Sequence, residues 1–204
     1  MTMLIENPWL EEEIKLERQS RGIDQHDEVW DGVYFMTPIA NNDHQRFIGD
    51  LVFILQVTIG MPSLGEVLPG VNLAASAEGW KHDYRVPDVV VFLNESTAEN
   101  HDTFWTGAAD FVIEITSPGD RTYEKIPFYS RLGVRELLIV NRESWTVELY
   151  RWQNGVLEKV GQSSADTSEV LRSNVVPLEF RLLPGQPQPQ LEIVHPATQQ
   201  RWTV

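Results

Sequence analysis

The chain has 204 residues, of which 42% are hydrophobic and 10% aromatic, and this composition is enough for one folded domain with a sizeable core. It carries 16 Lys and Arg against 30 Asp and Glu, and the net charge of −14 argues against loose, charge-driven binding to nucleic acid or to an anionic membrane. Cysteine is absent, which excludes disulfides, thiol nucleophiles and thiolate zinc sites, and we expect a cytoplasmic protein.

The charge is distributed unevenly along the chain. Residues 1–110 hold 19 acidic and 6 basic side chains, whereas residues 111–152 hold six of each and are neutral. The six basic residues of that second stretch fit either a solvated helix face or a local site for an anionic substrate. They are Arg121, Lys125, Arg131, Arg135, Arg142 and Arg151.

The N-terminal segment, residues 1–24, is predicted to contain a short amphipathic helix over 9–21 that packs against the domain or a partner subunit. It lacks the basic start and the apolar run of a signal peptide. No stretch of the sequence approaches the 18 apolar residues of a membrane span, and we therefore expect no membrane partner.

The next elements are predicted from turn residues and periodicity. Asp31-Gly32 between two short apolar runs predicts a β-hairpin over 29–36. Asn41-Asn42-Asp43 offers an N-cap for a helix over about 43–59, where apolar residues recur at helical spacing. Strand-like alternation follows around 66–75.

The second half predicts more strands and one more helix. Strands are expected over 86–93, 110–116 and 136–141, with a helix over about 121–132 that ends at Gly133. Residues 145–152 and 156–160 are expected to form a hairpin around Asn154-Gly155. Together these elements predict one α/β or α+β domain over 25–185, with a mixed sheet flanked by helices and extra hairpins. A C-terminal extension over 186–204 follows this domain.

Two apolar strands each carry an acid. Asp88 opens the strand Val86 to Leu93, and Glu114 stands in the middle of Phe111 to Thr116. A carboxylate among apolar side chains is costly to bury unless it is paired or binds a metal. Either acid alone fits a buried ion pair, or an edge strand with Glu114 in water, whereas the two together suggest a magnesium site. Lys125, on the helix after Glu114, is a candidate to position the attacking water.

The order of these motifs resembles a known family. Four motifs follow one another along the chain. They are Pro87-Asp88, Glu114 in a strand that ends at Ser117-Pro118, Lys125 four residues before Tyr129, and the run from Gly133 to Val140. This looks like the bacterial restriction-endonuclease-like proteins of the PD-(D/E)XK nuclease superfamily, a family long carried as a domain of unknown function. The resemblance covers roughly residues 25 to 185 and implies a restriction-endonuclease-like fold.

The resemblance implies site residues and a cofactor. It makes Asp88 and Glu114 metal ligands, with Ile115 offering its backbone carbonyl to magnesium or manganese. The usual lysine of the superfamily would fall at Thr116, and in this family it is displaced onto the following helix, where Lys125 matches it. Further candidates for substrate contact are Arg85, Arg121 and His44, although cap or surface chemistry is the alternative for His44.

Three functions remain open at this point. The first is a metal-dependent endonuclease that hydrolyses phosphodiester bonds of DNA and works as a homodimer. The second is a catalytically silent binding or regulatory module on the same fold. The third is a hydrolase of small phosphate esters, which the acidic surface would tolerate better than long DNA.

Overall fold

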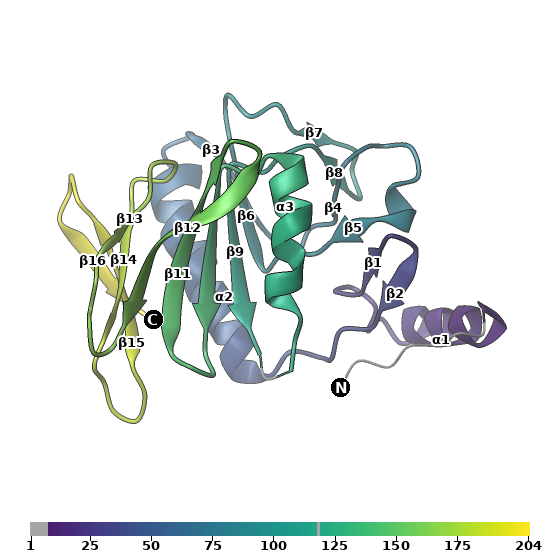
Figure 1. Ribbon diagram of the computed structural model, residues 1–204, viewed down its shortest axis with the longest axis horizontal. Helices are drawn as coiled ribbons and strands as arrows, with labels where there is room; N and C mark the ends of the chain where they lie inside the picture. The colour runs from purple at the N-terminus through teal and green to yellow at the C-terminus, as the bar shows by residue number, and fades with distance from the viewer. Residues whose placement is uncertain (1–7, 118) are drawn as a thin grey trace.

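The computed structural model describes residues 8–117 and 119–204, and its centre is a six-stranded mixed sheet (Figure 1). The spatial order is β12-β11-β10-β9-β6-β3, in which β9 and β10 run parallel and all other neighbours antiparallel. The strands are β3 (Gly65–Pro69), β6 (Val89–Leu93), β9 (Phe111–Thr116), β10 (Glu136–Asn141), β11 (Thr146–Gln153) and β12 (Val156–Ser164). The predicted α+β fold with a mixed sheet is confirmed.

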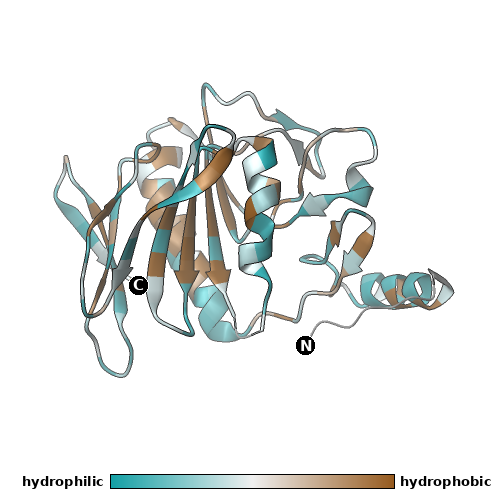
Figure 2. Cartoon of the chain, viewed as in Figure 1, coloured by the Kyte–Doolittle hydropathy of each residue, from teal (hydrophilic) through white to brown (hydrophobic). Residues whose placement is uncertain are grey.

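Helices cover both faces of this sheet, which explains why its central strands are apolar along their length (Figure 2). On one face lies α2 (Asn42–Leu55), which continues as a π-helical turn (Gln56–Gly60). On the other lies α3 (Ile126–Leu132), preceded by a 3₁₀ turn (Thr122–Lys125). Each strand therefore sends alternate side chains into two separate cores.

The helix boundaries follow the local signals in the sequence. The Asn41 side chain accepts a hydrogen bond from the backbone N–H of His44 at 2.8 Å, so Asn41 is the N-cap of α2. Helix α3 has Pro127 in its first turn and ends at Gly133, whose φ of +84° places it in the left-handed region. These two of the three predicted helices are confirmed, although the final turn of α2 is π-helical and the opening turn of α3 is 3₁₀.

A second six-stranded sheet has the order β2-β1-β5-β4-β8-β7. The predicted hairpin is present, because Asp31 (φ 48°) and Gly32 (φ 84°) turn the chain from β1 into β2. Helix α1 (Pro8–Ser20) is attached here through Arg18, whose Nε donates to Asp27 Oδ2 at 2.6 Å. The elements are β1 (Glu28–Trp30), β2 (Val33–Phe35), β4 (Leu73–Ala74), a 3₁₀ turn (Trp80–His82), β5 (Tyr84–Arg85), β7 (Glu99–Asn100) and β8 (Trp105–Thr106).

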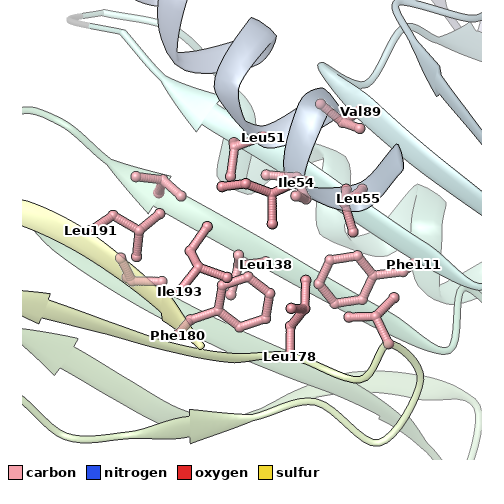
Figure 3. Close-up of a cluster of buried hydrophobic side chains, with 14 of the residues drawn as sticks. Leu51, Ile54, Leu55, Val89, Phe111, Leu138, Leu178, Phe180, Leu191 and Ile193 are labelled. Carbon is pink, nitrogen blue, oxygen red and sulfur yellow. The ribbon is translucent and has the colours of Figure 1, made fainter. Parts of the chain in front are cut away.

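The C-terminal part forms a four-stranded antiparallel sheet of β13 (Leu171–Arg172), β14 (Glu179–Leu183), β15 (Gln190–His195) and β16 (Gln200–Thr203). Phe180, Leu191 and Ile193 from this sheet pack in one core with Leu55 of α2 and Leu138 of β10 (Figure 3). The segment 186–204 therefore pairs with strands of the domain that precedes it and shares its core. No helix in the described parts of the chain is long and apolar enough to cross a membrane.

Candidate active site

Strand pairing brings Asp88 and Glu114 together. β6 and β9 are antiparallel neighbours, and their register pairs Val89 with Ile113. Asp88 immediately precedes β6, so it lies at the strand end next to Glu114, whose side chain faces α3. The backbone N–H of Ile115 donates to Asp88 Oδ2 at 2.6 Å, which fixes the Asp88 side chain against β9.

Glu114 is buried and paired. Its side chain is 4% exposed in a central strand, which excludes the alternative of an edge strand with Glu114 in water. Lys125 Nζ lies 3.1 and 3.2 Å from its two carboxylate oxygens, and the Tyr129 hydroxyl donates to Oε1 at 2.5 Å. Burial raises the pKa of Glu114 to about 8, although the Lys125 charge acts in the opposite direction.

Lys125 therefore reaches Glu114 as the sequence predicted, from the 3₁₀ turn that opens the following helix. Thr116, where the resemblance would have placed a lysine, is buried, and its Oγ1 has no hydrogen-bond partner in the described chain. The Tyr129 ring lies in the core, and its hydroxyl holds Glu114.

Glu28 is a member of this cluster that the sequence analysis missed. Its Oε1 lies 2.8 Å from Lys125 Nζ and accepts a hydrogen bond from the backbone N–H of Val86 at 2.8 Å. Its Oε2 accepts a hydrogen bond from Trp30 Nε1 at 2.6 Å. The signal was an acid at the start of the apolar run Val29-Trp30, the same pattern that singled out Asp88. Burial lowers the pKa of Lys125, but the charges of Glu114 and Glu28 outweigh it and raise that pKa, so the side chain stays an ammonium.

His44 lies against Asp88 from the first turn of α2. Its Nε2 is 3.0 Å from Asp88 Oδ1, and the residue is only 9% exposed. The alternative of surface chemistry is therefore wrong, because the imidazole is buried and oriented toward a predicted metal ligand. Its Nδ1 is buried with no hydrogen-bond partner among the described residues.

These side chains open onto a cleft of about 540 Å³. The chain from β2 to α2 forms one wall and the segment after β9 forms another; Figure 1 shows the β2–α2 connection passing below the ends of β9 and α3. The lining includes Glu28, His44, Asp88, Glu114 and Lys125. Residues from three motifs that are separated in the sequence thus line one cavity.

A comparison with protein families identifies the relatives of this chain. The model of the Uma2 family, described as "Putative restriction endonuclease", matches residues 11–185. The chain belongs to the Uma2 family. The family resemblance noted in the sequence is confirmed, and segment 186–204 lies outside the match.

A solved structure is similar to this Uma2 family member. It is a crystal structure described as that of a putative nuclease from Anabaena variabilis, with a TM-score of 0.58 and 16% sequence identity. The similarity covers 72% of this chain and 80% of that chain, and at this identity it shows a shared fold alone. No curated protein sequence matches the chain.

Arg85 does not reach the cleft of this Uma2 domain. It is 3% exposed, its Nη1 donates to Val29 O at 3.0 Å and Asp83 Oδ1 at 2.8 Å, and it is not among the lining residues. Its guanidinium lies 4.6 Å from the Trp30 ring and 4.2 Å from the Phe128 ring. The expectation that Arg85 contacts substrate phosphate is therefore wrong; the side chain holds β1, β5 and α3 together.

Arg121 does line the cleft. Its guanidinium lies 5.1 Å from the Trp30 ring and 4.8 Å from the Phe35 ring, and its Nε donates to Glu124 Oε1 at 2.7 Å. Its position is compatible with the substrate contact that the sequence suggested.

The cluster fits a divalent cation in charge and donor type. Glu28, Asp88 and Glu114 bring three carboxylates, whereas Lys125 brings one ammonium, so ionised carboxylates leave an excess of negative charge in a largely buried site. No group of three His, Asp or Glu side chains in residues 8–117 and 119–204 is arranged to hold an ion by itself. Two carboxylates with a backbone carbonyl suit magnesium, which usually keeps water and substrate oxygens in its shell.

Proposed function

We propose that this protein is a metal-dependent nuclease that hydrolyses phosphodiester bonds of DNA. The observation that carries the proposal is that Asp88, Glu114 and Lys125 line one cleft at the ends of β6 and β9, with Lys125 Nζ 3.1 Å from Glu114. The description of the Uma2 family as restriction endonucleases supports the reaction class.

Asp88, Glu114 and the Ile115 carbonyl would hold magnesium, or manganese, at the end of the two strands. When bound, the ion would neutralise charge on the phosphate and make water a stronger nucleophile. The surrounding residues fix these ligands. His44 and the Ile115 N–H hold the two oxygens of Asp88.

Lys125 would act as a hydrogen-bond donor and positive charge beside the scissile phosphate. Glu28 and Glu114 keep its pKa raised, so it is protonated before the reaction begins. A protonated lysine orients water and stabilises the charge that develops on phosphate oxygens, but it cannot take the proton from water. We therefore assign Lys125 to positioning and charge stabilisation.

Glu28 would position Lys125 without touching the substrate phosphate. Its two oxygens are occupied by the Val86 N–H, Trp30 Nε1 and Lys125 Nζ. The Lys125 side chain therefore lies between two carboxylates that share its charge. This arrangement fixes the ammonium next to Glu114, at the side of the cleft where the phosphate would lie.

The size of the cleft also favours a second candidate, a hydrolase of small phosphate esters. A volume of about 540 Å³ suits a small ligand, and the acidic chain would repel a long polyanion. A substrate screen with oligonucleotides and nucleotide monoesters separates the two candidates, since the first predicts cleavage of the oligonucleotide.

The experiment that tests the proposal follows cleavage of plasmid and oligonucleotide with magnesium, with manganese, and with a chelator. We expect cleavage only with a divalent ion, and we expect Asp88→Asn and Glu114→Gln each to abolish it. Asp166→Asn, which changes an exposed carboxylate outside the cleft, is the matched control and should cleave like the wild type. Metal-independent cleavage, or none with any ion, would contradict the proposal; metal binding without cleavage would favour the silent module.

A further inference from the structure

An aromatic surface lies beside the carboxylates, and the chemistry proposed above does not use it. The register of β1 and β2 pairs Glu28 with Phe35, and Trp30 follows Glu28 on the same face of the hairpin. All three side chains line the cleft. The ring centroids of Trp30 and Phe35 are 4.3 Å apart, and Trp30 Nε1 donates to Glu28, so the ring is fixed next to the cluster.

Arg121 packs on these two rings and extends the surface that they form. Its guanidinium lies within 5.1 Å of both ring centroids, and Glu124 holds it in place. We call Trp30, Phe35 and Arg121 the stacking surface. Aromatic rings and arginine planes are the groups on which proteins stack unpaired nucleobases.

The charges in the cleft do not suit duplex DNA. Among the described lining residues, the Lys and Arg side chains are Lys125 and Arg121, and both are already paired with carboxylates. A duplex is usually bound through several neutralised phosphates, and that binding is weak where few free cations are present. Much of the remaining wall is apolar, including Met36, Pro38 and Ile48.

We infer that the cleft takes an unpaired nucleotide of a single strand, with its base against the stacking surface and the adjoining phosphodiester at Asp88 and Glu114. The place of the phosphodiester rests on the proposed function, whereas the place of the base rests on Trp30, Phe35 and Arg121. The cleft volume of about 540 Å³ lies in the range of sites for small ligands, which fits one nucleotide better than a duplex segment.

Binding of fluorescent oligonucleotides tests this inference. The protein carries Glu114→Gln to block turnover; because this variant is expected to lose the metal, the assay measures the contact with the base alone. Fluorescence anisotropy compares a single strand, a hairpin duplex of the same length, and a single strand whose bases are replaced by abasic sites. We expect the single strand to bind about tenfold more tightly than the other two, because only its bases can stack.

Phe35→Leu, added to this background, keeps an apolar side chain and removes the ring. We expect it to weaken single-strand binding about tenfold and to leave the duplex and the abasic strand unchanged. Phe53→Leu is the matched control, since Phe53 is 56% exposed on α2 and does not line the cleft. If Phe35→Leu lowers the unfolding temperature below the assay range, Phe35→Met takes its place with the same expectation.

Three outcomes overturn the inference. The duplex binds as tightly as the single strand or more tightly, the abasic strand binds as tightly as the single strand, or the single strand shows no detectable binding. Hydrolysis by the wild type is scored separately. Binding of the single strand without magnesium-dependent cleavage contradicts the proposed function and supports the stacking surface. Cleavage of duplex and single strand at equal rates supports the proposed function and overturns the inference.

Discussion

Lys125 Nζ lies between two buried carboxylates, 2.8 Å from Glu28 Oε1 and 3.1 Å from Glu114 Oε1, and so joins the N-terminal hairpin to the central sheet. The three side chains are at most 13% exposed. A buried ammonium with two carboxylate partners ties stability to the geometry of the site, because removing Lys125 leaves two buried carboxylates without a counter-charge.

Replacement of Lys125 should lower both stability and activity. Lys125→Met leaves Glu28 and Glu114 without their cation, and we expect a loss of about 3 kcal/mol in the free energy of unfolding. Cleavage should fall about a hundredfold or more, since the charge beside the phosphate is lost. Urea denaturation and initial rates measure the two effects.

A double variant separates the structural and catalytic parts of this loss. Lys125→Met combined with Glu28→Gln removes one uncompensated charge, and we expect it to recover part of the stability and none of the activity. Recovery of cleavage in the double variant would contradict the role assigned to Lys125.

The pH dependence of stability should reveal the environment of Glu114. Burial raises its pKa from 4.5 to about 8, so its contribution to folding is fully present below 4.5 and is lost as the pH rises through about 8. Without metal, raising the pH from about 5 to about 8 should therefore lower the unfolding temperature of the wild type relative to that of Glu114→Gln. Differential scanning fluorimetry measures it; a constant difference across this range would show that the pKa is not raised.

Magnesium affinity should rise over the same pH range, because a metal ion competes with the proton on Glu114. Isothermal titration calorimetry at about pH 6 and pH 8 should show tighter binding at the higher value. Asp166→Asn should follow the wild type, whereas a pH-independent affinity would contradict the raised pKa.

His44 should support the metal site through Asp88. His44→Ala removes the partner 3.0 Å from Asp88 Oδ1, and we expect magnesium affinity to fall by about 10- to 100-fold. His101→Ala is a control on a histidine outside the cleft lining. An unchanged affinity in His44→Ala would show that the contact does not orient Asp88.

Arg85 should matter for folding and not for substrate binding. Its hydrogen bonds to Val29 O and Asp83 Oδ1 are buried or partly buried, and Arg85→Met should cost about 2 kcal/mol or more of unfolding free energy. The KM for an oligonucleotide should stay as in the wild type at a temperature where the variant is folded. A raised KM with unchanged stability would show that Arg85 contacts the substrate phosphate, which contradicts this account.

Local chemistry made much of the fold predictable from the sequence. Asp31-Gly32, Asn41 and Gly133 act within a few residues, so the hairpin, the N-cap and the helix end could be predicted without the rest of the chain. Asp88 and Glu114 stood out because each acid accompanies an apolar strand, and the pairing of β6 with β9 brings both into one cleft.

Other site residues depend on tertiary packing that a single sequence does not display. Glu28 meets Lys125 only because the hairpin folds against the turn before α3, far away along the chain. The Tyr129 ring packs in the core, and only the folded position of Glu114 gives its hydroxyl a hydrogen-bond partner. Arg85 looked like a phosphate contact because exposure cannot be read from residue type.

The most direct measurement of the central claim is anomalous diffraction from a crystal of this protein soaked in manganese. The account predicts an anomalous peak between the carboxylates of Asp88 and Glu114, in contact with the Ile115 carbonyl, and loss of the peak in Glu114→Gln. A fully occupied peak elsewhere, or none between these side chains while Lys125 keeps its contact with Glu114, would contradict it.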